Sequence, residues 1–388
     1  MTSRIRVALY SHDTLGLGHT RRNLAVAETL VAADDRIDVL MITGNPEVLQ
    51  LPQPRRTDLI TLPTVMKDPD GTYRPRRQRC ELAELIDLRT QVITAAVRSF
   101  APQLLVVDKI ADGLQGELLP TLRALRADPN TKIVLGLREI LDSPTAVRRE
   151  WRAAGTADVI KDHYDEVWVY GDPAVFDPAR EYGWAVGQGN TINYLGYLGR
   201  SRPAAPPTRP RSTPTEPYLL CQVGGGQDGY ALADAFARAE LPAGHRGVIL
   251  TGPYLSADDR DRLYRVAGSA VDIVDFVPNP EEFVDGASAV VSMAGYNSTV
   301  ELLSTSIPVL LVPRVTPRVE QLIRAERLAD AGHVDLLRPE LLQPGRLTAW
   351  MAAAVTRPPQ DRSAVDLGGL QRIQELALRL IEGVPDAA

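Results

Sequence analysis

Short apolar runs alternate with stretches of helical apolar spacing along most of this chain. In the first 200 residues, strand-like runs occupy 5–10, 39–43, 104–107, 133–135 and 167–169. Stretches such as 24–30 and 82–97 repeat apolar residues every three or four positions, as helices do. Strands that alternate with helices predict a parallel sheet joined by crossover helices.

The same alternation returns after residue 217, with strand-like runs at 218–223, 247–250, 271–274, 289–291 and 309–312. Between the halves, residues 201–217 are rich in proline and lack apolar periodicity, which predicts an extended linker. The 388 residues exceed what one hydrophobic core usually supports. We therefore predict an α/β protein with two Rossmann-like domains, 1–200 and 218–369, followed by a terminal segment, 370–388, that contains a last helix.

Glycines and polar residues follow two strand-like runs of the carboxyl-terminal half. Three consecutive glycines, Gly224, Gly225 and Gly226, can expose successive backbone N–H groups that wrap a phosphate. Farther on, Gly295 precedes a predicted helix start that contains Asn297, Ser298 and Thr299, and anions are favoured at such starts. We predict a diphosphate site there, with Glu301 one turn later as the acceptor of hydrogen bonds from a ribose diol.

The first predicted strand leads into a second glycine-rich turn, Gly16-Leu-Gly18-His19, and then into a helix. Histidine titrates near neutral pH, so His19 is our candidate for the base that takes a proton from a hydroxyl group. His12 and Asp13 lie in the same loop and are the reserve candidates. Alternatively, His19 only orients the loop, because a helix start disfavours a charged imidazole.

Together these motifs resemble the GT-B glycosyltransferases, most closely the MurG-related branch, which is similar to glycosyltransferase family 28. The match follows, in order, Ala294-Gly295, Ser298-Thr299-Val300-Glu301, Pro308, Pro313, Glu320-Gln321, Ala325 and Gly332. In the amino-terminal half, Gly18-His19 ends the first loop as in that branch. The resemblance implies the GT-B fold, in which the parallel sheets of two Rossmann-like domains face each other across a cleft. It also implies that the last helix crosses back to the amino-terminal domain.

The resemblance assigns further residues to the nucleotide-sugar donor. Phe276 and Val277 follow a strand whose end holds the base in that branch, although Phe276 also suits a plain core position. The donor-binding residues predicted in this way are Gly18, Gly224, Gly225, Gly226, Phe276, Val277, Gly295, Asn297, Ser298, Thr299, Glu301, Glu320 and Gln321. The chain departs from the branch at Gly226, where the branch has serine, and at Glu320 and Arg324 near the sugar. N-acetylglucosamine is therefore not carried over as the sugar.

The implied activity is transfer of a sugar from a nucleotide-diphosphate sugar, with UDP or dTDP as nucleotide, to an acceptor hydroxyl or amine. GT-B enzymes usually stabilise the leaving diphosphate with helix starts and backbone donors. Since Cys80 and Cys221 show no metal-ligand spacing, we predict no metal and no cofactor. With His19 as base, the reaction inverts the anomeric carbon. Arg21 and Arg22 follow the first loop and bear on the choice of acceptor.

Charge and composition limit the classes of partner that we expect for this protein. A net charge of −6 argues against nucleic acid. The absence of a signal-peptide pattern and of a long apolar run predicts a cytoplasmic protein. We expect a monomer or a homodimer. A basic cluster, 74–79, is expected to be a solvated loop, with a phosphate- or lipid-facing patch as the alternative. We favour a specialised metabolite such as an antibiotic as acceptor over a lipid-linked or glycan acceptor, because no amphipathic basic helix indicates a membrane surface.

Two other functions of the same fold stay open. A sugar-nucleotide 2-epimerase binds the same donors and needs no acceptor. A non-catalytic partner subunit binds nucleotide weakly or not at all, and it has no need for the polar residues Glu301, Glu320 and Gln321 at strand ends.

Overall fold

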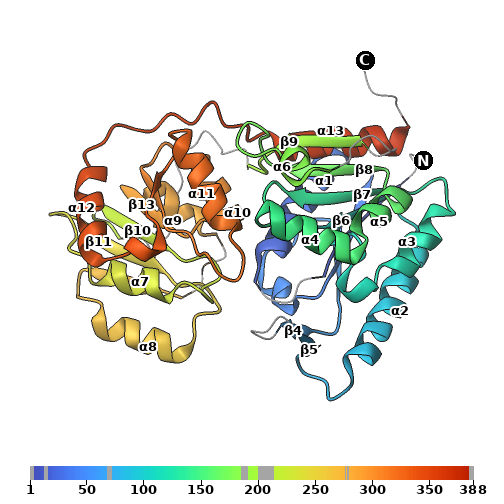
Figure 1. Cartoon of the computed structure of the whole chain (residues 1–388), viewed down its shortest axis with the longest axis horizontal. Helices are drawn as coiled ribbons and strands as arrows, with labels where there is room; N and C mark the ends of the chain where they lie inside the picture. Colours follow the sequence, from blue (N-terminus) through green and yellow to red (C-terminus); the bar gives the residue numbers. More distant parts are fainter. Residues whose placement is uncertain are drawn as a thin grey trace. The chain divides into compact units, whose positions relative to one another are not determined.

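The computed structural model describes residues 4–12, 16–67, 72–184, 191–199, 214–275, 277 and 279–383. The chain forms two compact units (Figure 1). Unit 1 comprises Met1–Pro173, Asp177–Leu198 and Gly368–Ala388, and unit 2 comprises Ala174–Phe176 and Gly199–Leu367. Most of the predicted linker, from 201 to 213, lies outside the described residues.

Unit 1 is built on a seven-stranded parallel sheet in the order β3-β2-β1-β6-β7-β8-β9. Its strands are β1 (Ile5–Ser11), β2 (Ile37–Thr43), β3 (Thr57–Thr61), β6 (Leu104–Asp108), β7 (Lys132–Arg138), β8 (Glu166–Tyr170) and β9 (Thr191–Gly196). The order in which strands are added reverses between β1 and β6. Ligands of open α/β sheets bind at the carboxyl ends of the strands at such a reversal.

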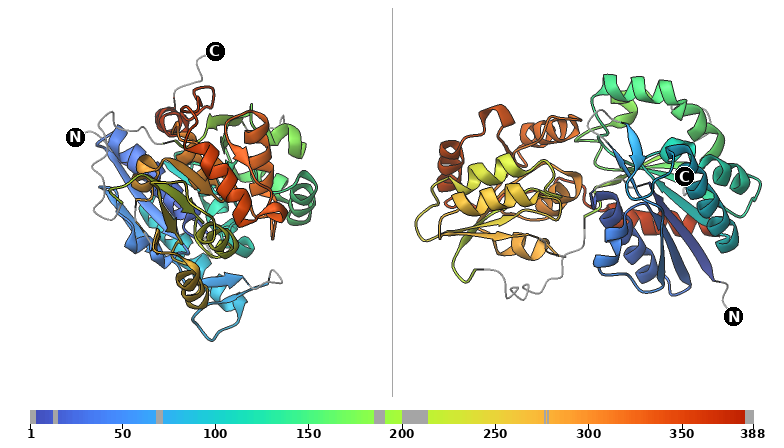
Figure 2. Two further views of the ribbon diagram at one scale, coloured as in Figure 1. Left: turned by 90° about the vertical axis from the view of Figure 1, so that its left-hand side faces the viewer. Right: turned by 90° about the horizontal axis from the view of Figure 1, so that it is seen from below.

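Helices cover both faces of this sheet, so β6 and β8 are buried at every position (Figure 2). The helices are α1 (Gly18–Ala33), α2 (Leu82–Phe100), α3 (Leu119–Arg126), α4 (Pro144–Ala154), α5 (Thr156–His163), α6 (Pro178–Tyr182) and α13 (Gly369–Glu382), with short 3-10 turns η1 (Pro46–Gln50) and η2 (Leu114–Gly116). The last helix, α13, packs beside α1 and β9, and its Arg379 pairs with Glu166 of β8. A small antiparallel pair, β4 (Val65–Lys67) and β5 (Tyr73–Pro75), lies outside the main sheet.

Unit 2 repeats the design with a six-stranded parallel sheet in the order β12-β11-β10-β13-β14-β15. The strands are β10 (Tyr218–Gln222), β11 (Arg246–Leu250), β12 (Val271–Val274), β13 (Ala289–Ser292), β14 (Val309–Leu311) and β15 (Asp335–Leu336). The helices are α7 (Tyr230–Ala237), α8 (Ala257–Val266), α9 (Glu281–Gly286), α10 (Tyr296–Leu303), α11 (Glu320–Asp330) and α12 (Pro344–Ala354), with a 3-10 turn η3 (Pro339–Leu341). Here the order of addition reverses between β10 and β13.

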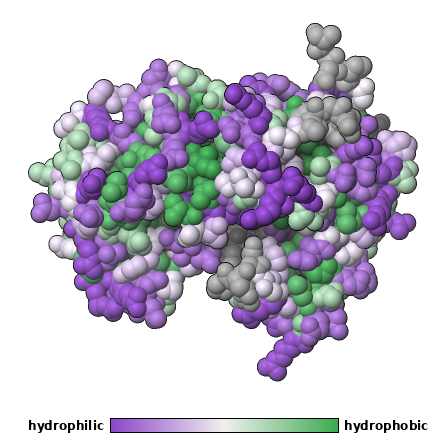
Figure 3. Space-filling model, in the orientation of Figure 1, coloured by the Kyte–Doolittle hydropathy of each residue, from purple (hydrophilic) through white to green (hydrophobic). Residues whose placement is uncertain are grey.

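The predicted α/β class with two Rossmann-like parallel sheets is confirmed. The sequence pattern missed the edge strands β3 and β9, because their partly exposed faces carry polar residues and form no continuous apolar run. The basic cluster is not wholly a loop, since Arg74 lies in β5 and pairs with β4. Hydrophilic residues cover most of the face shown in Figure 3. In the described part of the chain, no helix combines the length and the apolar character needed to span a bilayer.

Candidate functional site

The reversal point of unit 1 gathers polar side chains from two strand ends and one helix start. Ser11, the last residue of β1, pairs in register with Asp108, the last residue of β6. His12 follows β1 directly, and His19 lies in the first turn of α1. Arg22 comes one turn later on the same helix. The topology therefore brings residues that are distant in sequence to one edge of the sheet.

His19, Arg22 and Asp108 form one hydrogen-bonded cluster. The Nδ1 atom of His19 is 2.6 Å from Oδ2 of Asp108. The Nη2 atom of Arg22 is 2.8 Å from Oδ1 and 2.6 Å from Oδ2 of Asp108, and 2.8 Å from Nδ1 of His19. The side chains of Asp108 and Arg22 are 1% and 2% exposed, whereas that of His19 is 18% exposed. Only His19 of the three is thus open to a reactant.

The charge states of the cluster follow from its contacts. Burial opposes ionisation of Asp108, but the charges and hydrogen bonds of Arg22 and His19 outweigh it and hold the pKa of the carboxyl well below its usual range. An ionised carboxylate only accepts hydrogen bonds, so the 2.6 Å contact favours a proton on Nδ1 of His19, with Nη2 of Arg22 donating to Asp108. The Nε2 atom of His19 then carries the lone pair. A neutral imidazole held in one tautomer by a carboxylate is suited to accept a proton.

Of the two reserve candidates for the base, His12 and Asp13, the structure describes His12. His12 is buried, and its ring centroid lies 5.8 Å from that of His19. Burial, with the nearby His19 and Lys109 charges, lowers the pKa of His12 well below its usual value. Its Nδ1 atom has no hydrogen-bond partner among the described residues. Asp13 lies outside the described residues.

Sequence reasoning missed Asp108 as the partner of His19. It named Asp13 as a reserve candidate for the base, because Asp13 lies in the same loop as His19, whereas Asp108 is 89 residues from His19. A signal was present, since the apolar run 104–107 ends in an acidic residue at the carboxyl end of a strand. A strand-ending aspartate beside the first strand of a Rossmann-like half is a candidate for the site even without a local motif.

A second buried network supports the turn after β1. The Arg89 guanidinium on α2 pairs with Glu117 through Nε and, at 2.7 Å, through Nη2. It also donates to the backbone oxygens of Pro63 and His12, at 2.7 and 3.4 Å. Burial and the Glu117 charge raise the pKa of Tyr10 well above its usual value, so its hydroxyl stays protonated and donates to Glu117. This network fixes the backbone from which His12 projects.

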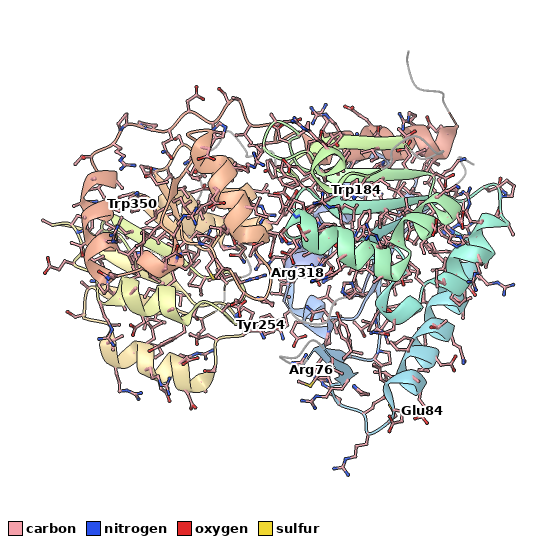
Figure 4. The ribbon with its side chains drawn as sticks, viewed as in Figure 1. Arg76, Glu84, Trp184, Tyr254, Arg318 and Trp350 are labelled. Atoms are coloured by element: carbon pink, nitrogen blue, oxygen red, sulfur yellow. The ribbon has the colours of Figure 1, made fainter. Side chains whose placement is uncertain are left out.

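The reversal point of unit 2 holds the predicted glycine turn. Gln222, which ends β10, pairs in register with Ser292, which ends β13. Gly224 and Gly226 have φ angles of +62° and +92°, which favour glycine. The backbone N–H of Tyr254, labelled in Figure 4 in the loop after β11, donates to the carbonyl of Gly225 at 2.9 Å. The turn is therefore braced by the neighbouring loop.

Position 226 is glycine for a steric reason as well. A Cβ atom there would lie 2.1 Å from the backbone oxygen of Thr251. No side chain fits at that distance without a backbone shift. The close packing of the turn on the loop after β11 thus explains why this chain has glycine where the MurG-related branch has serine.

The start of α10 and the start of α11 line the same edge of unit 2. Gly295 caps α10 without a side-chain hydrogen bond, and the first N–H groups of a helix have no partner inside it. Several buried atoms have no hydrogen-bond partner among the described residues, and those at the ends of β10, α10 and α11 include Nε2 of Gln222, Oγ1 of Thr299 and Oε2 of Glu320. Buried polar atoms are normally paired, so these three indicate places that a ligand or water would satisfy.

Arg314 joins the elements around this edge. Its Nη2 atom donates to Oε1 of Glu320 at 2.7 Å. Its Nε atom lies 3.3 Å from Oδ2 of Asp228, which follows the glycine turn. Its backbone N–H reaches the side-chain oxygen of Gln321 at 3.3 Å. Arg324, fully buried on α11, donates to the carbonyl of Ala294 at 2.9 Å. Glu320 and Gln321 are thus held by the protein itself on one side, while Oε2 of Glu320 is left for another partner.

The other predicted donor residues lie as follows. Asn297, Ser298 and Thr299 occupy the first turn of α10, and Glu301 lies farther along the same helix, partly buried. Val277 follows β12 and is partly buried, whereas Phe276 lies outside the described residues. Gly18 begins α1 in unit 1, next to His19.

Part of the chain matches a known protein family. Residues 223–365 match the Glycosyltransferase family 28 C-terminal domain. Among curated proteins, the chain is 28% identical over 250 residues to an Anaeromyxobacter sp. (strain Fw109-5) protein, covering 61% of this chain and 62% of that protein. It is 28% identical over 183 residues to a Mesorhizobium japonicum protein, covering 46% of each. Both are named UDP-N-acetylglucosamine–N-acetylmuramyl-(pentapeptide) pyrophosphoryl-undecaprenol N-acetylglucosamine transferase. The chain thus spans about half of the length of these relatives.

Comparison with solved structures covers nearly the whole chain. The spinosyn forosaminyltransferase SpnP has a TM-score of 0.61 at 16% identity, covering 99% of this chain and 96% of that one. The calicheamicin glycosyltransferase CalG4 has a TM-score of 0.58 at 17% identity, with coverages of 98% and 96%. MurG of Acinetobacter baumannii has a TM-score of 0.56 at 15% identity, with coverages of 97% and 99%. These structures confirm the predicted GT-B fold, and the relation to glycosyltransferase family 28 is confirmed for residues 223–365.

Proposed function

We propose that this chain, which has the GT-B fold and carries a family 28 carboxyl-terminal domain, transfers a sugar from a nucleotide-diphosphate sugar to an acceptor hydroxyl. The observation that carries the proposal is the contact of 2.6 Å between His19 and Asp108 at the reversal point of unit 1. A partly exposed imidazole with its lone pair on Nε2 is the group that such a transfer requires of the acceptor side.

The proposed step moves one proton and one glycosyl group. Nε2 of His19 takes the proton of the acceptor hydroxyl, and the acceptor oxygen forms a bond to the anomeric carbon. The bond from that carbon to the diphosphate oxygen breaks, and its electron pair leaves with the diphosphate. Attack opposite the leaving group inverts the anomeric configuration. Asp108 stabilises the imidazolium through the proton on Nδ1.

Unit 2 is the proposed donor site. The glycine turn after β10 and the start of α10 offer backbone donors to the diphosphate, which carries the negative charge that develops as the bond breaks. The unsatisfied atoms of Gln222, Thr299 and Glu320 support a ligand at this edge. Since these groups supply the electrostatic stabilisation, we propose a reaction that needs no metal ion.

UDP or dTDP is the proposed nucleotide. The curated relatives are named as users of UDP-N-acetylglucosamine, and a structural neighbour, the glycosyltransferase VinC, was solved in complex with DTDP, at a TM-score of 0.58 and 17% identity. Two structural neighbours are named as a calicheamicin glycosyltransferase and a spinosyn forosaminyltransferase, which supports a specialised metabolite as acceptor.

A thermal-shift screen against UDP, dTDP, GDP and ADP tests the donor site directly. A ligand at a hundred times its dissociation constant adds about 2.7 kcal/mol of stability, which raises the unfolding temperature measurably. Candidate donors that stabilise the chain are then incubated with and without acceptors, and free nucleotide and glycoside are quantified. Sugar consumption that needs no acceptor would instead identify a 2-epimerase, and no stabilisation by any nucleotide would overturn the proposal.

A further inference from the structure

Arg22 is a third member of the His19–Asp108 pair. Its Nη2 atom contacts both oxygens of Asp108 and lies 2.8 Å from Nδ1 of His19. Its guanidinium lies 5.8 Å from the ring centroid of Tyr170 on β8. A carboxylate that only had to orient a histidine would need no buried guanidinium beside it.

The charges of the cluster change when His19 takes a proton. With His19 neutral, Asp108 and Arg22 sum to zero. Protonation puts a second cation in contact with Arg22, because Nη2 and Nδ1 are both donors and share Oδ2 of Asp108. Like charges this close in a buried site repel strongly. Without Arg22, the same protonation would neutralise the Asp108 carboxylate and would be favoured.

Further charged and titratable groups lie at this edge of the sheet, including Glu139 just after β7 and Asp172 shortly after β8, both buried. Of the described residues, His12 follows β1 and is buried, and Lys109 follows β6 with its cation acting on His12. Arg89 of α2 reaches the His12 carbonyl but is paired with Glu117. Tyr170 of β8 offers its ring to Arg22. Asp108 is the carboxylate that contacts both His19 and Arg22.

We propose that Arg22 is a positioning residue that holds Asp108 in place as the acceptor for Nδ1–H of His19 while opposing protonation of Nε2. This makes His19 a weak base, suited to an acceptor hydroxyl that is already acidic, such as a phenol. An acidic hydroxyl gives its proton to a weak base, whereas an aliphatic alcohol does not do so readily. The acceptor class rests on the proposed function, but the role of Arg22 does not.

The role of Arg22 is tested by NMR titration of the full chain with labelled histidine. The chain has five histidines, and the His19 signal is assigned by its loss in H19Q. In R22Q, which keeps a hydrogen-bond donor but removes the charge, the midpoint of the His19 titration moves to higher pH by about one unit. In R22K, which keeps the charge, it stays near the wild-type value. In D108N it moves to lower pH, because the carboxylate is lost.

R22M keeps the aliphatic stem and gives a second test if R22Q does not fold, as judged by circular dichroism. A midpoint in R22Q or R22M that is unchanged or lower than in wild type would overturn the role of Arg22. So would a wild-type histidine whose ¹⁵N shifts place the proton on Nε2 at high pH.

The acceptor class is tested separately with UDP-glucose and dTDP-glucose as donors. We expect wild type to glycosylate 4-nitrophenol faster than phenol, and phenol faster than cyclohexanol. The advantage of 4-nitrophenol over phenol should shrink in R22Q. Equal rates for phenol and cyclohexanol would overturn the acceptor class. No transfer from any donor would count against the proposed function, while the titration would still decide the role of Arg22.

Discussion

His19 and Asp108 are 89 residues apart in sequence, yet Nδ1 of the first lies 2.6 Å from Oδ2 of the second. The contact exists because β1 and β6 are neighbours, although α1, β2, β3 and α2 separate them along the chain. Both residues occupy the carboxyl edge of the sheet at its reversal point. The pair is therefore a property of the topology of unit 1, and its consequences for rate, stability and ligand binding can be measured.

Replacing His19 with alanine should abolish efficient transfer and spare donor binding. Loss of a positioned base costs about 10²–10⁴-fold in rate. The nucleotide is expected to bind unit 2, whereas His19 belongs to unit 1. Single-turnover rates and calorimetric nucleotide affinity of H19A measure the two effects. The NMR coupling of the anomeric proton in the product reports inversion; a retained configuration, or an H19A variant as fast as wild type, would exclude His19 as the base.

Asp108→Asn should destabilise the fold and should do so in a pH-dependent way. Breaking a buried ion pair leaves Arg22 without its anionic partner, which costs about 3–5 kcal/mol. The pKa of Asp108 is lowered in the folded chain, so its contribution is fully present above the unfolded carboxyl pKa of about 4 and is lost as pH falls towards the folded value. Urea unfolding at several pH values should show the gap between wild type and D108N narrowing in acid. A gap that is as large at about pH 2 as at pH 7 would contradict this.

The sequence predicted the two parallel sheets better than it predicted the His19–Asp108 pair at the edge of the unit 1 sheet. Buried parallel strands such as β6 are continuous apolar runs, so they are visible in the sequence. Edge strands such as β3 mix polar and apolar residues and are not. The glycine turns are visible because they are local. Asp108 and Arg22 were not identified as partners of His19, since a contact across the sheet depends on strand order, which local patterns do not specify.

Metal chelation gives a further prediction. Backbone donors of the glycine turn and of the α10 start are proposed to stabilise the leaving diphosphate, so turnover should survive treatment with EDTA. The measurement compares initial rates before and after chelation and after addition of Mg²⁺ or Mn²⁺. Activity that disappears with EDTA and returns with either ion would show that a metal supplies this stabilisation.

Glu301 is predicted to hold the ribose of the donor. Replacing it with alanine should weaken nucleotide binding by about 1.5–3 kcal/mol, the range for a hydrogen bond that involves a charged group. Isothermal titration calorimetry with UDP or dTDP measures the loss. Glu240 is exposed between the end of α7 and the start of β11 and provides the matched control, since E240A removes the same group away from the carboxyl ends of the strands. Equal affinities for wild type and E301A would remove Glu301 from the site.

Gly226→Ser should destabilise unit 2, although serine is the residue of the MurG-related branch at this position. Its φ angle of +92° strains any side-chain-bearing residue, and a Cβ would also lie 2.1 Å from the oxygen of Thr251. Gly244 has a φ angle of +75°, and no described heavy atom lies within 4 Å of a Cβ built there, so G244S carries the strain without the clash. We expect G244S to lose about 1 kcal/mol of unfolding free energy and G226S at least about twice that, because a second cost adds to the first. Equal losses in the two variants, measured by urea unfolding, would show that the turn moves freely away from Thr251. In that case close approach of the nucleotide, and not the packing of the turn, would explain why residue 226 is glycine. The G226S variant would then bind nucleotide more weakly than wild type without a matching loss of unfolding free energy.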